Sequence, residues 1–338
     1  MTENGNFKRR VRTRAAKTGE SYTAALRHVR QTLSNDLAPE PKSVRLAVAQ
    51  TAACDDPRNI DELHDSGRAM RRLMREARRA GARIVHFPEG AICSPNKRIM
   101  SISGPEKVGP SDWGRVEWAV LREELDAARN LARELGLWTV FGSVHQLTQP
   151  RWPHNSLYVV SDRGELVTRY DERMLSNTKI SFMYTPGSIP VTFEVDGLCF
   201  GCALGMESHF PEIFIEYERL NVHCVLFSTT GGSSSNATGS SADAAFAAEM
   251  QGHAASNSYW ASFAVHAQHS VAAPSGIVAP GGRWAAQCPA DGTPAIAVVD
   301  INDNPGDLAR PWRRTARSGI YESHLVQDDH RSDDRSTF

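Results

Sequence analysis

The chain has 338 residues, of which 41% are hydrophobic and 23% charged, a composition typical of a soluble globular protein with a large core. Its formal net charge of −1 creates no overall field that would attract nucleic acid or an anionic membrane, and we expect neither as a partner. The sequence contains no apolar run of bilayer-spanning length and no apolar signal-peptide core at its N-terminus, so we expect a cytoplasmic protein.

Residues 1–43 differ in composition from the rest of the chain. They begin with a basic arm, in which the cations are Lys8, Arg9, Arg10, Arg12, Arg14 and Lys17. Apolar residues then recur at helical spacing between Tyr22 and Leu33, which predicts an amphipathic helix. Two prolines in residues 35–41 indicate a linker. We therefore expect an N-terminal helical extension separate from the main domain.

From Val44 onward, apolar runs rich in β-branched residues alternate with helical patterns. Strands are predicted at residues 44–51, 82–87, 137–143, 156–161, 166–170, 191–194, 198–204, 222–228, 259–267, 276–278 and 295–301. Helices are predicted at residues 59–80, 114–136, 211–220 and 242–256. The mixture of βα units with helix-free strand pairs favours two stacked sheets with helices outside. We place this α/β domain at residues 44–310 and a polar tail at residues 311–338.

Two of the predicted strands end in residues that are candidates for a functional site. The buried run from Ile84 ends at Pro88-Glu89, and strand ends are where open α/β folds place ligand-binding groups. The apolar run at 198–204 breaks at Gly205, and a polar stretch then closes on Phe210-Pro211-Glu212. Such a break predicts a sharp turn from a strand into the following helix.

Several segments, in order, resemble the nitrilase superfamily of carbon–nitrogen hydrolases over residues 44–302. Residues 44–50 resemble its opening strand, and residues 84–90 the strand that ends in a catalytic glutamate. The segments at 155–158 and 170–175 resemble the strand pair that presents a catalytic lysine, and residues 201–212 resemble the elbow that carries a nucleophilic cysteine. The resemblance implies a four-layer α-β-β-α sandwich that forms a homodimer or a larger homo-oligomer.

The catalytic residues of that family carry over only in part. Glu89 matches the glutamate position, but Glu172 stands where the lysine belongs and Gly205 where the cysteine belongs. Lys179 falls beyond the strand end in this comparison, so the lysine role is not assigned to it. Cys202 lies three residues before the elbow, within the strand, where its sulfur would be buried or on the other side of the sheet. A glutamate at 172 would oppose a nearby thiolate, so we expect no thiol catalysis.

Two functions remain open. In the first, Glu89 and Glu172 share a proton and perform acid–base chemistry on a small nitrogen-containing metabolite, such as an amide, a nitrile or an amino-acid-like compound. Gly205 then leaves space for a water or a substrate group. In the second, the chain is a catalytically inactive pseudoenzyme that serves as a binding, regulatory or assembly partner.

Further residues could contribute to the pocket. Glu207 and His209 follow the elbow and are candidates for it, although helix capping and surface contact would explain them equally well. The loop at 229–241, rich in Gly and Ser, either lines the site or is simply a flexible loop. A metal held by Glu89, Glu172 and Glu207 has no spacing motif in its favour, and we expect neither a metal nor a cofactor.

Overall fold

The computed structural model describes residues 3–36, 42–52, 54–231, 241–304 and 306–319, together with Glu322, Asp329 and Arg331. The chain divides into two compact units, Met1–Pro41 and Lys42–Phe338. Most of the predicted linker lies outside the described residues, as does most of the predicted polar tail beyond residue 319.

The N-terminal unit consists of two helices, α1 (Glu3–Thr18) and α2 (Tyr22–Asp36). Val11 of α1 is buried together with Ala25 and Val29 of α2, so the two helices form a small apolar contact of their own. The basic arm is thus itself helical, which the cation-rich composition concealed. Its sparse apolar side chains lie on one side of the helix, and that spacing is enough to pack it on α2.

The larger unit contains two six-stranded sheets, with strand orders β12-β1-β2-β3-β4-β5 and β11-β10-β9-β8-β7-β6. The first sheet comprises β1 (Ser43–Gln50), β2 (Ile84–His86), β3 (Trp138–His145), β4 (His154–Val160), β5 (Leu166–Asp171) and β12 (Ala295–Asn302). The second comprises β6 (Thr192–Val195), β7 (Leu198–Leu204), β8 (Cys224–Ser228), β9 (Trp260–Ala264), β10 (Gly276–Val278) and β11 (Trp284–Gln287).

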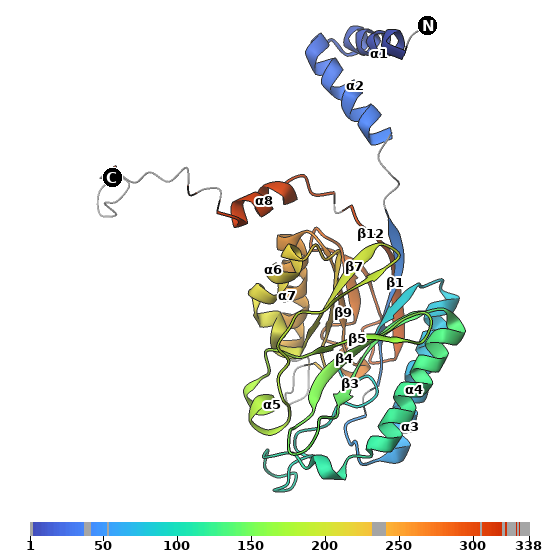
Figure 1. The fold of residues 1–338 in the computed structure, drawn as a ribbon, viewed down its shortest axis with the longest axis vertical. Coiled ribbons are helices and arrows are strands. Elements are labelled where there is room, and N and C mark those ends of the chain that lie inside the picture. Colours follow the sequence, from blue (N-terminus) through green and yellow to red (C-terminus); the bar gives the residue numbers. More distant parts are fainter. Residues whose placement is uncertain are drawn as a thin grey trace. The chain divides into compact units, whose positions relative to one another are not determined.

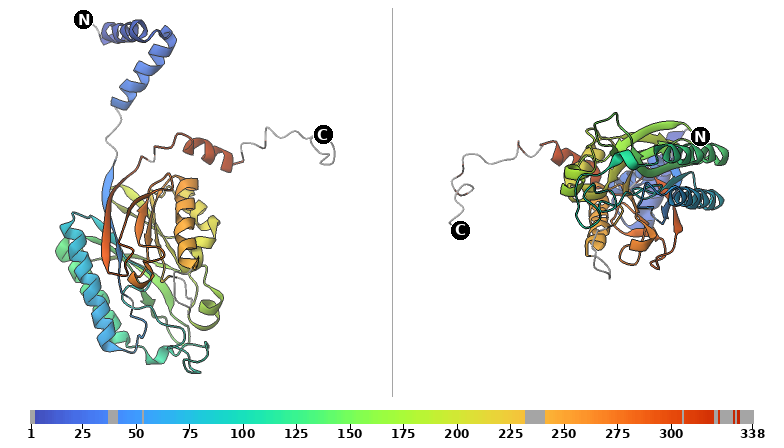
Figure 2. Two further views of the ribbon diagram at one scale, coloured as in Figure 1. Left: turned by 180° about the vertical axis from the view of Figure 1, so that it is seen from behind. Right: turned by 90° about the horizontal axis from the view of Figure 1, so that it is seen from below.

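Helices cover the outer face of each sheet, so the unit has four layers (Figure 1). Figure 2 shows the same arrangement from behind, with α3 and α4 on one side and α6 and α7 on the other. The predicted α-β-β-α sandwich is confirmed. The helices are α3 (Ile60–Arg79), α4 (Trp118–Leu135), α5 (Asn177–Phe182), α6 (Pro211–Arg219), α7 (Ser241–Asn257) and α8 (Arg310–Arg317), with 3-10 turns η1 (Trp113–Arg115), η2 (Gly205–His209) and η3 (Ala267–His269).

The amphipathic pattern of α3 shows how the outer layers form. Asn59 caps the helix by accepting a hydrogen bond from the Glu62 backbone N–H at 3.2 Å. One face, which includes Leu63, Met70 and Leu73, is buried in the core beneath the helix, while the arginines lie largely on the other face. A second core fills the space between the two sheets, and a third lies beneath α6 and α7.

The strand directions bring particular strand ends together. In the first sheet β2 and β3 are parallel, β4 is antiparallel to β3, and β5 is antiparallel to β4. The carboxyl ends of β2 and β5 therefore lie at the same end of the sheet as the start of β4. In the second sheet β7 and β8 are parallel, with Leu204 opposite Ser228, so their carboxyl ends are neighbours.

Besides α1 and the short 3-10 turns, the elements not expected from the sequence are β11, α8 and α5. Strand β11 is short and only partly buried, α8 is rich in arginine, and α5 has no buried side chain, so none of them produces a strong apolar pattern. Arg314 and Arg317 of α8 pair with Glu218, which ties part of the predicted polar tail to α6. None of the helices in the described part of the chain combines the length and apolar character needed to cross a bilayer.

Candidate active site

Polar side chains gather where the strands of the first sheet end. Glu89 follows β2, Glu172 directly follows β5, and Asn155 lies at the start of β4. All three are buried. The strand order explains why residues so far apart in sequence meet, because the first sheet aligns these three strand ends.

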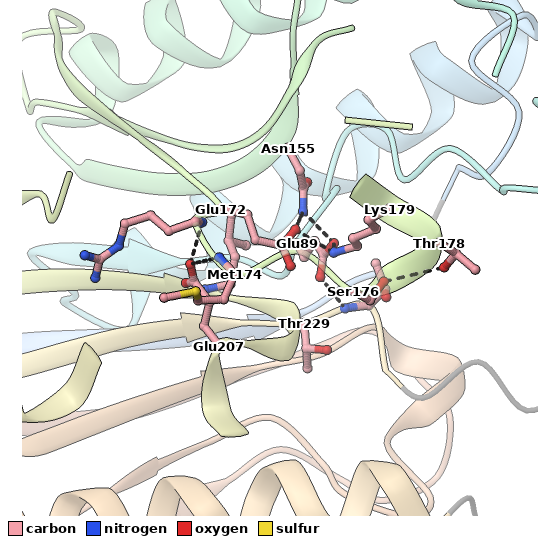
Figure 3. A network of polar contacts seen from close by, with 12 residues as sticks. Glu89, Asn155, Glu172, Met174, Ser176, Thr178, Lys179, Glu207 and Thr229 are labelled. Atoms are coloured by element: carbon pink, nitrogen blue, oxygen red, sulfur yellow. Dashed lines mark hydrogen bonds and ion pairs between the residues drawn. The ribbon is translucent and has the colours of Figure 1, made fainter. Parts of the chain in front are cut away.

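Lys179 joins the three side chains into one cluster (Figure 3). Its Nζ donates to Glu89 Oε1 at 2.6 Å and to Glu172 Oε2 at 2.7 Å. Asn155 Nδ2 donates to the same two oxygens, at 2.8 Å and 2.6 Å. Two carboxyl groups are thus clamped between one ammonium and one amide, which is the arrangement that lets them lie close together.

The presence of Lys179 corrects the sequence analysis, which left this residue outside the site and the site without a cation. Lys179 belongs to α5, and the chain turns back after β5 so that this helix carries the lysine over the strand ends. Because α5 buries no side chain, nothing in its hydrophobic pattern indicated this path. Glu172 stands where the resemblance places a lysine, and Lys179, seven residues further along the chain, brings a positive charge to the same place.

The environment favours a proton on Glu172. Burial raises the pKa of Glu172 to about 8, the Lys179 ammonium opposes this shift, and Glu89 and Glu207 add to it. Burial works against the charge of Lys179, but Glu172 and Glu89 outweigh it and raise the pKa of Lys179. The cluster therefore combines a lysine whose charge is favoured by its two carboxyl neighbours with a Glu172 whose protonated form is favoured by burial.

Gly205 lies against this cluster from the second sheet. Its φ of +54° is in the left-handed region that favours glycine. A Cβ atom at this position would lie 2.6 Å from Glu172 Oε1 and 2.9 Å from Lys179 Nζ. The space expected above Gly205 is thus partly occupied by the ends of Glu172 and Lys179, and a glycine here is what allows these two side chains to approach.

Glu207, on η2 just after Gly205, is buried and accepts several hydrogen bonds from the backbone. It accepts hydrogen bonds from Tyr170 Oη at 2.7 Å, from the Leu204 backbone N–H at 2.7 Å, and from the Arg173 N–H at 2.6 Å. The Met174 N–H adds a longer contact at 3.3 Å. Burial raises the pKa of Glu207, while these donors lower it. Its contacts fasten the elbow to the end of β5.

His209, the other residue predicted after the elbow, contacts α7. Its Nδ1 lies 2.6 Å from Glu249 Oε1, and its ring lies 5.2 Å from that of Phe246. The side chain is 37% exposed. The sequence suggested both Glu207 and His209 as pocket residues. In the structure Glu207 is buried beside the cluster, whereas His209 lies at the surface against α7.

Residues distant in sequence hold Glu89 in place. His266 Nε2 lies 2.7 Å from the Glu89 carbonyl oxygen, and the Thr230 backbone N–H donates to Glu89 Oε2 at 3.2 Å. Burial lowers the pKa of His266 to about 4, so its ring is neutral and Nε2 carries the proton for this contact. Thr230 belongs to the predicted site-lining loop, of which residues 232–240 lie outside the described part. No local motif indicated His266.

The cysteines are free thiols, and most are buried. Cys202 lies in the core between the two sheets, and burial raises the pKa of its thiol. Within the described residues, the side-chain hydrogen bonds of Glu89, Glu172 and Lys179 join them to one another, to Asn155 and to Thr230, and none involves a thiol. In the same ranges no group of three or more His, Cys, Asp and Glu side chains is arranged to hold a metal ion.

Comparisons with known proteins agree with this architecture. The family model for the carbon-nitrogen hydrolases matches residues 45–310. A mutant of the Nesterenkonia AN1 amidase from the nitrilase superfamily is 18% identical, with a TM-score of 0.62 over 86% of this chain and 100% of its own. A crystal structure of an amidase from Nesterenkonia sp. is 18% identical, with a TM-score of 0.58 over 83% of this chain and 98% of its own.

A further mutant structure of that amidase shows covalent addition of the acetamide moiety of fluoroacetamide at its active site cysteine. It is 17% identical, with a TM-score of 0.59 over 85% of this chain and 98% of its own. At these identities the likeness shows a common fold. No curated protein matches the chain.

Proposed function

The chain belongs to the carbon–nitrogen hydrolase family, and on that premise we propose that it acts on a small nitrogen-containing metabolite by carboxylate acid–base chemistry instead of thiol chemistry. The observation that carries the proposal is the clamp in which Lys179 and Asn155 hold Glu89 and Glu172 together. The residue at the elbow is Gly205, which has no nucleophile to offer.

The two carboxyl groups take different roles in this mechanism. Glu89 accepts a proton from a water, whose hydroxide adds to the carbon of an amide-like C–N bond. Glu172, neutral because of its burial, and the Lys179 ammonium stabilise the negative charge that develops on the substrate oxygen. Glu89 then gives its proton to the departing nitrogen as the C–N bond breaks. Water and substrate supply every atom of the products, and both carboxyl groups return to their initial states.

The test measures turnover of a panel of primary amides, nitriles and amino-acid amides, with ammonia release as the readout. We expect Glu89→Gln and Glu172→Gln each to reduce the rate by about 10²-fold or more, the usual size of a general acid–base contribution. Glu134→Gln, at an exposed position on α4, is the matched control and should leave the rate unchanged. Melting temperatures confirm that each variant is folded.

Alkylation by iodoacetamide distinguishes this mechanism from a thiol mechanism, because loss of activity with retained folding would indicate a catalytic cysteine. Equal activity of the wild type and both site variants would remove the carboxylate mechanism. Binding of panel members without any turnover would instead favour the second function, a catalytically inactive binding protein, for which the glycine at the elbow is the supporting observation.

A further inference from the structure

The near-zero net charge of the chain is the sum of two unlike parts. Residues 1–41 contain 8 Lys and Arg against 4 Asp and Glu, a net charge of +4, whereas the remaining residues contain 30 against 35, a net charge of −5. The whole-chain value of −1, from which we expected no nucleic-acid partner, therefore conceals a basic N-terminal unit joined to an acidic main unit. Charge concentrated on one small unit creates a local field that the total does not describe.

Helix α1 carries most of these cations and has almost no acidic residue to balance them. Six of its 16 residues are Lys or Arg, and only Glu3 is acidic. Four of the cations are exposed, namely Lys8, Arg9, Arg12 and Lys17. Among the side chains that the structure describes, no ion pair joins any of these four to a carboxylate, whereas Arg14 pairs with Glu20 at 2.6 Å. The four exposed cations are therefore available to an external anion.

Helix α3 shows that arginine content alone does not make such a surface. Its six arginines share the helix with four acidic residues. Three of the arginines form ion pairs, those of Arg68 with Asp65, Arg71 with Glu124 and Arg72 with Glu76. The exposed side of α3 therefore alternates in sign, whereas α1 has no acidic residue after Glu3.

The exposed cations of α1 follow the side of the helix that α2 does not cover. Phe7, Val11 and Ala15 pack with residues of α2 and occupy one side of α1. At 3.6 residues per turn, positions 8, 9, 12 and 17 fall on the remaining side. At a rise of about 1.5 Å per residue, these four cations extend over about 14 Å of helix length. They form one continuous surface, which we call the basic face of α1.

We propose that the basic face of α1 binds double-stranded DNA through its phosphate backbone. B-form DNA carries one negative charge per about 1.7 Å of its axis, so a length of about 14 Å offers about eight phosphate charges to the four cations. Its major groove is about 12 Å wide and admits an α-helix. Arginine also matches the geometry of phosphate with two parallel hydrogen bonds. This inference goes beyond the proposed function and does not depend on it.

The composition of the basic face argues against other polyanions. A helix that lies on a membrane inserts an apolar side, but the apolar side of α1 is engaged with α2. Besides the cations, the exposed residues of the described face are Thr13, Ala16 and Thr18. Single strands are held by stacking on aromatic rings, and Phe7, the aromatic residue of α1, packs against α2. The major groove of duplex RNA is too narrow for a helix.

The experiment measures binding of the full chain to a fluorescently labelled DNA duplex of about 20 base pairs and mixed sequence, by anisotropy. Four neutralised phosphates predict a slope of about −3 to −4 in the logarithm of affinity against the logarithm of salt concentration. Affinity should therefore fall about 100-fold between about 50 mM and about 200 mM salt. Labelled duplex RNA, poly-glutamate and vesicles of phosphatidylcholine with phosphatidylserine should each bind at least about tenfold more weakly than the DNA.

Paired substitutions locate the binding surface. Arg9→Gln combined with Arg12→Gln should weaken DNA binding at least about tenfold at about 50 mM salt and make the slope less steep by about 2. Lys8→Gln combined with Lys17→Gln removes the same charge elsewhere on the basic face and should repeat this result. Arg75→Gln combined with Arg79→Gln removes the same charge from exposed positions on α3 and is the matched control, which should bind like the wild type. Circular dichroism confirms that each variant retains its helices.

Several results would overturn the inference. One is an equal loss of DNA binding in the α3 control, which would mean that total charge and not the basic face matters. Another is a salt slope that both α1 variants leave unchanged. Poly-glutamate, duplex RNA or the vesicles binding as tightly as the DNA would assign the face to a different partner, and no DNA binding at about 50 mM salt would leave it without this one. Ammonia release by the same variants is a separate measurement, because none of the substitutions touches the candidate active site.

Discussion

Glu172 and Glu207 are both buried beside the β7 elbow, and they differ in how completely their oxygens are hydrogen-bonded. Burial raises the pKa of both. Glu207 accepts hydrogen bonds from one hydroxyl and from the backbone of Leu204, Arg173 and Met174. Glu172 has all its donors on one oxygen, and within the described ranges its other oxygen is left without a partner. Burial alone therefore does not distinguish the two carboxyl groups, whereas their hydrogen bonding does.

The largest effect should come from removing the structural carboxylate. Glu207→Leu leaves the donors of Tyr170, Leu204 and Arg173 buried without an acceptor, and we expect it to lower the free energy of unfolding by about 3–5 kcal/mol. Glu172→Gln keeps an acceptor and a donor in place and should change it by less than about 1 kcal/mol. Urea denaturation measures both.

A variant that fails to fold would leave this comparison incomplete, so Glu207→Gln provides a milder second measurement, with an expected loss of about 1–3 kcal/mol. Equal losses in Glu207→Gln and Glu172→Gln would show that the two carboxyl groups play the same structural part.

The second-largest loss of stability should come from removing Lys179, the cation that joins Glu89 to Glu172. Lys179→Met leaves two buried carboxyl groups without their ammonium, and we expect a loss of about 3 kcal/mol near neutral pH. Without the lysine both groups favour the protonated form, so their pKa values rise above those of the unfolded chain. Stability that depends on protonated carboxyl groups is lost as the pH rises, so the loss should be smaller at about pH 5 than at about pH 8.

Lys107→Met, at an exposed position, is the matched control and should show neither effect. If the loss in Lys179→Met were the same at both pH values, the lysine would not be holding two ionisable groups together.

The sequence predicts the strand-borne half of the site well and the helix-borne half poorly. Glu89 and Gly205 end apolar runs whose strand character is evident, and the order of those runs identifies the fold. Lys179 reaches the cluster through α5, whose position depends on contacts distant in sequence, and a helix with no buried side chain has no apolar pattern to read. His266 lies 177 residues from the carbonyl that it holds, so only the assembled sheets reveal that contact. The sequence led us to expect a raised pKa for Glu172 because a second carboxyl group lies nearby, whereas burial is the largest cause of that rise.

The smallest expected loss of stability comes from Gly205→Ala, which tests whether Glu172 and Lys179 need a residue without a side chain at position 205. Gly205→Ala adds a Cβ at 2.6 Å from Glu172 Oε1 and imposes a φ of +54° on a residue with a side chain, and we expect a loss of about 2 kcal/mol in the free energy of unfolding. Gly136→Ala is the matched control, because Gly136 has a φ of +60° and no heavy atom within 4 Å of its added Cβ. Gly136→Ala therefore measures the backbone strain alone, at about 1 kcal/mol. The extra loss in Gly205→Ala, beyond that of the control, measures the cost of displacing Glu172 and Lys179.

A double variant tests whether this displacement is the cause of the extra loss. Glu172→Ala makes room for the new methyl group, so Gly205→Ala combined with Glu172→Ala should be about 0.5–1 kcal/mol more stable than the sum of the two single losses predicts. Strict additivity would mean that the two positions do not depend on each other, and that the glycine is required only by the backbone of the elbow.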